Sequence, residues 1–335
     1  MNKIDWWLLL PAIFLLSLGL LVLKSTASEV FVSQLIFAII GIVVFIIVNL
    51  IDVKLLLAFR YWGYILVIIL LVATFIFGSL TRGSTRWINL GVVSIQSSEV
   101  TKPILLLTLS TVTGPMFWLL SGLPLLLIFV QPDLGTALVL GVGCVTMIIT
   151  QLSLRRVLLL GLLAITLVVP LAYFGLHGYQ RERLQTFINP YADPAGRGYH
   201  VIQSMIAVGT GGWFGRGLGQ GTQSQLRFLP EYHTDFIFAA LSEELGFVGG
   251  SLVLILYTIM LGRLFWLGRD NDSLILGIAA MLSFKIFVNI GMNIGIAPVT
   301  GITLPFLSYG GSSLISLFIT LGLAASSQAS QKRRY

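Results

Sequence analysis

The apolar run WWLLLPAIFLLSLGLLVL covers residues 6–23, contains no charged side chain and points to one fold class. An α-helix needs about 20 mostly apolar residues to cross some 30 Å of hydrocarbon, so this run has the length and character of a membrane span. No small-residue cleavage motif follows it, and further apolar runs come after it, so we expect a retained helix rather than a secretion signal.

The composition of the whole chain supports the same class of protein. Of its 335 residues, 56% are apolar and only 10% are charged, with a mean hydropathy of +0.96. A soluble domain usually carries about 25% charged residues, which rules out a water-exposed globular surface here. Cys144 is the only cysteine, which excludes a disulfide scaffold.

The apolar runs predict an all-α polytopic membrane protein forming one transmembrane domain over residues 1–335. A spanning segment must satisfy its own backbone in lipid, and a barrel would show short alternating segments instead. The ten predicted helices cover about 6–23, 31–50, 61–78, 99–113, 115–131, 136–152, 157–174, 236–261, 274–295 and 311–327.

The distribution of basic residues sets the count and the orientation. Residues 99–131 as one helix would extend about 50 Å, too long for a bilayer, so we divide them at 113–115. Ten spans then place most lysines and arginines of the short loops and tails, including Arg155, Arg156 and Lys332, on one side. Basic residues mark the cytoplasmic side, which therefore holds both termini.

Three polar stretches then face outward, at about 79–99, 175–235 and 296–311. The second is far longer than an ordinary helix connection and contains all three histidines. Within it, the glycine-rich segment 209–221 follows no predicted strand and lacks a P-loop ending. We favour turns that let this segment approach other backbone, and keep open an amide contact to phosphate helped by Arg216.

Asp235 is the main candidate for chemistry, because it stands at the outer mouth of the eighth span. An aspartate there is an ordinary helix cap, and it is also able to act as a general base toward a sugar hydroxyl. His233 and Asp235 lack a third ligand at zinc spacing, which leaves open only a divalent cation, Mg²⁺ or Mn²⁺, between Asp235 and a substrate phosphate.

Charged residues inside spans require partners, because a lone intramembrane charge costs at least about 2.5 kcal/mol. Glu243 and Glu244 lie eight and nine residues beyond Asp235, about 12–14 Å deeper. Lys285 has a similar depth on the ninth span, so we predict an intramembrane pair between Lys285 and one of these glutamates. Glu99 and Lys102 are three residues apart and share a helix face, as a buried pair or as part of a polar cavity wall.

Taken together, the motifs resemble the SEDS family of rod-shape and division proteins (RodA, FtsW and SpoVE), and most closely its RodA branch. The resemblance covers nearly the whole chain. It rests on eight segments: 83–91 (GSTRWINLG), 131–137 (QPDLGTA), 198–204 (GYHVIQS), 221–226 (GTQSQL), 228–246, 288–292 (VNIGM), 298–301 (PVTG) and 304–313 (LPFLSYGGSS). Two departures matter: 96–99 reads QSSE without the usual proline, and the turn after the fourth span is shorter and uncharged.

The resemblance implies a peptidoglycan glycosyltransferase that polymerises lipid II outside the plasma membrane for cell elongation. It implies Asp235 as the essential residue and a class B penicillin-binding protein as partner. It carries over Trp87, Glu99 and Lys102, and we add as substrate-binding candidates His233 and the arginines Arg86, Arg181, Arg197, Arg216 and Arg227. The alternatives are a lipid II transporter, or flippase, and a non-catalytic scaffold of the elongation machinery.

Overall fold

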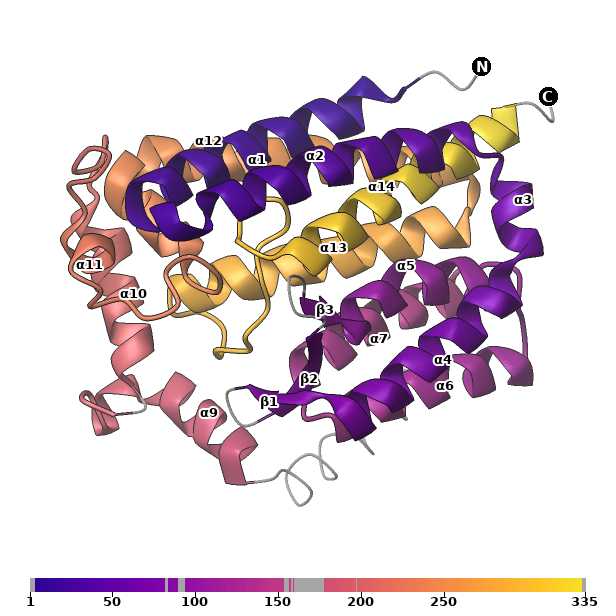
Figure 1. Cartoon of the computed structure of the whole chain (residues 1–335), viewed down its shortest axis with the longest axis horizontal. Coiled ribbons are helices and arrows are strands. Elements are labelled where there is room, and N and C mark those ends of the chain that lie inside the picture. The colour runs from indigo at the N-terminus through magenta and orange to yellow at the C-terminus, as the bar shows by residue number, and fades with distance from the viewer. Residues whose placement is uncertain are drawn as a thin grey trace.

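The computed structural model describes residues 4–81, 84–89, 94–153, 157, 159, 178–196 and 198–332. It shows an elongated bundle of helices (Figure 1). The long helices of the bundle are α1 (Trp6–Thr26), α2 (Ser28–Leu50), α4 (Arg60–Phe77), α5 (Ser97–Leu109), α6 (Pro115–Val130), α7 (Leu134–Ile149), α12 (Ile237–Leu267), α13 (Ser273–Asn293) and α14 (Gly311–Lys332). The shorter helices are α3 (Val53–Ala58), α9 (Gly178–Ile188), η1 (Pro190–Ala192), α10 (Tyr199–Thr210), α11 (Thr222–Gln225) and η2 (Gly268–Asp270).

Within the described residues, a helix lies at nine of the ten predicted spans, and the seventh, 157–174, falls almost wholly outside them. In the part of the chain that the structure describes, six helices are long and apolar enough to cross a membrane, while α6 and α7 are shorter apolar helices. The count of ten stays a prediction. The described chain begins and ends at the same end of the bundle (Figure 1), as an even number of crossings requires.

The helices α13 and α14 form the centre of the bundle. In each, 72% of the most apolar window is buried inside the protein, against 22% in α2 and α4. Helix α13 packs against α7, and α14 packs against α2 and α5. Polar side chains on α13 and α14 therefore face protein rather than lipid, which is where intramembrane polar groups are tolerated.

The connection between α4 and α5 contains a sheet that the all-α prediction missed. Strands β1 (Ser79–Thr81), β2 (Ser84–Asn89) and β3 (Ser94–Gln96) form an antiparallel sheet in the order β1-β2-β3. Trp87 on the middle strand pairs with Ser79 and with Gln96. The strands are too short for a clear alternating pattern, so pairing rather than periodicity defines them.

Helix α12 is broken at Gly246, and the glycine-rich segment fills the break. Gly246 has φ 68° and ψ −162°, and a Cβ there would lie 2.2 Å from the amide nitrogen of Gly215. The amides of Arg216 and Phe247 donate to the carbonyls of Glu243 and Gly212, at 2.9 and 2.8 Å. The favoured interpretation of residues 209–221, close backbone approach, is confirmed.

Candidate functional site

Asp235 lies at the end of a tightly held loop, one residue before the N-cap of α12. The N-cap is Phe236, so the predicted capping position is off by one residue. The backbone on both sides of Asp235 is strained. Glu231 in this loop and Phe306 in the facing loop adopt left-handed conformations, with φ 51° and 63°. Such strained residues persist only where the surrounding structure fixes them, and they concentrate at functional sites.

The segment 304–310 fastens the Asp235 loop from the other side. The Tyr309 amide donates to the His233 carbonyl at 2.9 Å, and the Ser308 hydroxyl donates to the Thr234 carbonyl at 2.6 Å. In the same connection, a methyl group placed on Gly301 would lie 3.7 Å from Asp235 Oδ2. Two outward stretches predicted separately, 175–235 and 296–311, thus meet at Asp235.

A buried charge cluster lies between two helices: Glu99 and Lys102 belong to α5, and Lys285 belongs to α13. Lys102 Nζ is 2.6 Å and Lys285 Nζ 3.9 Å from Glu99 Oε1, and each of these three residues is at most 5% exposed. Lys285 also donates to Ser313 Oγ at 3.1 Å, and Ser313 Oγ lies 3.2 Å from the hydroxyl of Thr303. The predicted Glu99–Lys102 contact is confirmed, and Lys285 joins it.

The predicted pairing of Lys285 with Glu243 or Glu244 is wrong. Both glutamates face the loop 217–225: Glu243 accepts hydrogen bonds from the amides of Gln223 and Ser224, at 2.8 and 3.1 Å. Glu244 accepts from the Ser25 hydroxyl at 2.7 Å. Depth along a helix was a poor guide, because it does not specify which side of the bundle a residue faces.

Arg86 connects the sheet to the loop before α7. Its guanidinium donates to the carbonyl of Pro132, and its Nη1 lies 3.8 Å from Asp133 Oδ1. Asp133 Oδ2 accepts from Gln96 Nε2 at 3.2 Å and from the Ser98 hydroxyl at 3.1 Å. Helix α5 begins at Ser97, two residues before the predicted start, and side chains of the QSSE segment anchor that start to Asp133 although the proline is missing.

The remaining candidates are more dispersed. Trp87 is partly buried on β2, while Arg216 and Arg227 are exposed. Arg216 Nη1 donates to the Thr222 hydroxyl at 3.0 Å, and Arg227 lies 3.9 Å from Glu29 in an open surface pair. Arg197 and the side chain of Arg181 lie outside the described residues. Their predicted roles, and those of Trp87, Arg216 and Arg227, remain predictions.

Two residues to which the sequence assigned no role complete the site. Asn289 and Asn293 lie one and two turns beyond Lys285 on α13 and so share its face. Both donate to the main-chain carbonyl of Asp235, each at 3.1 Å. The spacing of four residues between Lys285, Asn289 and Asn293 in an apolar helix was the sequence signal that could have predicted a shared polar face. This face of α13 joins the charge cluster to the Asp235 loop.

Metal ligands are not gathered at this site. Among the residues that the structure describes, no group of three or more histidine, cysteine, aspartate or glutamate side chains is placed to hold an ion. A divalent cation between Asp235 and a substrate phosphate stays a prediction, since a substrate would supply most of its ligands.

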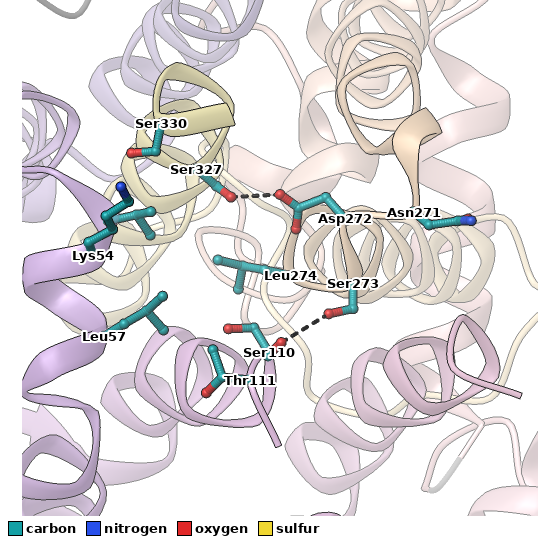
Figure 2. A pocket seen from close by; sticks show the side chains of 11 residues that line it. Lys54, Leu57, Ser110, Thr111, Asn271, Asp272, Ser273, Leu274, Ser327 and Ser330 are labelled. Carbon is teal, nitrogen blue, oxygen red and sulfur yellow. Dashed lines mark hydrogen bonds between the residues drawn. The ribbon is translucent and has the colours of Figure 1, made fainter. Parts of the chain in front are cut away.

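A cavity of about 250 Å³ lies elsewhere, at the junction of α3, α5, α13 and α14 (Figure 2). It is lined by Asp272, Ser327 and Ser330, near the end of the bundle that holds the described termini (Figure 1). The Ser327 hydroxyl donates to Asp272 Oδ2 at 2.6 Å, while Asp272 Oδ1 caps α13. None of the predicted site residues lines this cavity.

The fold and the site define a multi-pass helical membrane protein with a carboxylate loop and a buried charge cluster. Residues 3–333 match the FtsW/RodA/SpoVE family model of cell cycle proteins. The chain is 41% identical over 286 residues to the peptidoglycan glycosyltransferase MrdB of Escherichia coli K12, covering 80% of this chain and 77% of MrdB. It is 36% identical to stage V sporulation protein E of Bacillus subtilis, covering 95% of each.

Solved structures of related proteins have the same fold as this chain. A structure described as the coordination of polymerisation and crosslinking by a peptidoglycan synthase complex superposes with a TM-score of 0.82 at 34% identity, covering 100% of this chain and 99% of that one. The rod shape determining protein RodA of Thermus thermophilus gives a TM-score of 0.71 at 28% identity, covering 99% and 97%. The chain belongs to the FtsW/RodA/SpoVE family.

Proposed function

We propose that this protein is a peptidoglycan glycosyltransferase that polymerises lipid II into glycan strands at the outer face of the plasma membrane, with Asp235 as general base. The names of its relatives support the reaction class. The observation that carries the role of Asp235 is its place: it ends a strained loop, and the helix face that binds its carbonyl also carries Lys285.

The proposed chemistry uses the groups at the two ends of this α13 face, Asp235 at one end and Lys285 with its charge cluster at the other. Asp235 takes the proton from the 4-hydroxyl of the acceptor sugar, and the oxygen attacks the anomeric carbon of the lipid-linked donor. The bond from that carbon to the diphosphate breaks as the new glycosidic bond forms, and the diphosphate leaves with the bonding pair. A positioned general base contributes typically 10²–10⁴-fold to such a step.

The charge cluster, taken together with the ion pair of Arg86 and Asp133, suits the leaving diphosphate. Three cations, Arg86, Lys102 and Lys285, face two carboxylates, Glu99 and Asp133, which leaves one positive charge in excess. Preorganised cations in a site that excludes water stabilise charge that develops in the transition state.

We further propose that the protein serves elongation together with a class B penicillin-binding protein. The similarity to MrdB and to a rod shape determining protein supports the first part. The similarity to a synthase complex that couples polymerisation to crosslinking supports the second. A candidate transpeptidase is expected to co-purify with this chain and to raise its rate of glycan synthesis.

Reconstitution tests the proposal against its alternatives. Purified protein in liposomes with lipid II is expected to yield glycan polymer, and Asp235→Asn is expected to lower the rate at least 10²-fold while remaining folded. Asp270→Asn, in an exposed turn away from the site, is the matched control. Exchange of labelled lipid between leaflets without polymer would identify a transporter, and neither activity would identify a scaffold.

A further inference from the structure

Helix α13 presents two fully buried asparagines, one turn apart, to the main chain of Asp235. Asn289 and Asn293 are each 0% exposed, and the Nδ2 atom of each lies 3.1 Å from the Asp235 carbonyl oxygen. Buried amides in an apolar helix are costly unless every polar atom is satisfied. Two such side chains converging on one carbonyl therefore indicate a specific requirement at that residue.

Asn293 also binds the first turn of α12. The first N–H groups of a helix have no partner within the helix, and the N-cap Phe236 supplies no side-chain acceptor. Asn293 Oδ1 accepts from the Ala239 amide at 3.0 Å. A single side chain from α13 thus holds both the carbonyl of Asp235 and the start of the helix that follows it.

Asn289 joins Asp235 to the facing loop. Its Nδ2 also donates to the Ile302 carbonyl at 2.6 Å. Ile302 follows Gly301, the residue beside Asp235 Oδ2. Asn289 therefore sets the spacing between the Asp235 main chain and the backbone that lies against its carboxylate.

We propose that Asn289 and Asn293 are positioning residues for the Asp235 carboxylate, an inference that rests on the proposed function. Their amides contact only main chain at Asp235, so they act by holding that residue in place rather than by touching substrate. A displacement of about 1 Å at a reacting group can cost on the order of 10²-fold in rate. The loss should appear in kcat, because the cations of the charge cluster are left unchanged.

The experiment uses Asn289→Leu and Asn293→Leu in the full-length protein, with Asn49→Leu as matched control. Leucine is close to asparagine in shape and cannot hydrogen bond, and Asn49 is equally buried but lies near the end of α2 adjoining α3. Polymerisation of lipid II gives kcat and KM, and hydrogen exchange follows the Ala239 amide. We expect kcat to fall about 10- to 100-fold in both site variants with KM within about twofold.

Hydrogen exchange separates the two asparagines. The Ala239 amide should lose protection in Asn293→Leu and keep more of it in Asn289→Leu, a difference that general destabilisation would not produce. If both site variants keep the wild-type kcat while Asp235→Asn is inactive, the positioning role alone is overturned. An equal loss of kcat in Asn49→Leu overturns it as well. If Asp235→Asn polymerises lipid II like the wild type, the proposed base role fails and the inference with it.

Discussion

Glu99 and Glu243 are both buried glutamates in predicted spans, and the protein stabilises them in different ways. Glu99 is 5% exposed and contacts two ammonium groups, those of Lys102 and Lys285. Glu243 is 0% exposed and receives only neutral donors, from residues 222–224 at the start of α11. Positively charged side chains thus compensate the Glu99 carboxylate, whereas hydrogen bonds from neutral groups stabilise the Glu243 carboxylate.

The two environments point to two different roles, a binding role for the cluster around Glu99 and a structural role for Glu243. Two ammonium groups contact Glu99, one more positive charge than that carboxylate carries, which is the charge balance that the proposed diphosphate role requires. Neutral donors around Glu243 satisfy its two oxygens and bring no positive charge that could attract an anion. Glu243 therefore fixes the loop 217–225 to α12, whereas Glu99 belongs to the charge cluster that we propose stabilises the leaving diphosphate.

The largest effect is expected for Glu99→Gln. The change leaves Lys102 and Lys285 buried without the carboxylate that both contact, and breaking a buried ion pair in this way typically costs about 3–5 kcal/mol. Thermal unfolding in detergent should show a large drop in melting temperature, with loss of glycan synthesis. The double variant Glu99→Gln/Lys285→Met should recover part of the stability, because one uncompensated charge is removed. Wild-type stability in Glu99→Gln would contradict the comparison.

A smaller effect is expected for Glu243→Gln. The amides of Gln223 and Ser224 bond different oxygens of Glu243, so the NH2 group of a glutamine faces one of them, and about 1.5–3 kcal/mol of charge-assisted hydrogen bonding is lost. Limited proteolysis should cut the loop 217–225 faster than in the wild type. A loss of stability as large as that of Glu99→Gln would show that both glutamates depend on charge.

The smallest effect is expected for His200, an ionisable residue on α10 that has no ion pair among the described contacts. Its ring stacks on Phe236 at 6.3 Å, and partial burial lowers the pKa of His200 while the Glu231 carboxylate opposes that shift. Because the pKa of His200 is lower in the folded protein than its unfolded value of about 6.5, the contribution of His200 to the free energy of unfolding is complete above about pH 6.5. This contribution is lost as the pH falls through the folded pKa. His200→Gln should flatten the decline of melting temperature between about pH 7 and 5. If the melting temperature of His200→Gln falls with pH as it does in the wild type, groups other than His200 cause that fall.

Several features of this protein could be predicted from the chain because they depend on local composition. Apolar runs placed nine helices, since each run must bury itself in lipid whatever its neighbours are. The glycine-rich segment 209–221 predicted close backbone approach, because glycine alone leaves room for it. The start of α12 was placed within one residue, with Asp235 at its mouth.

Other features required the tertiary structure. The chain alone put Lys285, Glu243 and Glu244 at one depth, and the fold turned the lysine toward α5 and the glutamates toward α11. The sheet of β1, β2 and β3 also escaped prediction, because its strands are stabilised by pairing across the connection rather than by an internal pattern.

Hydropathy along the chain is enough to establish a membrane-embedded helical bundle and the place of each polar residue along its helix. Which of those residues meet, including the two asparagines on the Asp235 carbonyl, follows from how the helices pack. The reason is geometric: hydropathy records the position of a residue along the membrane normal, whereas a contact also depends on the rotation of each helix about its axis and on the neighbours it packs against.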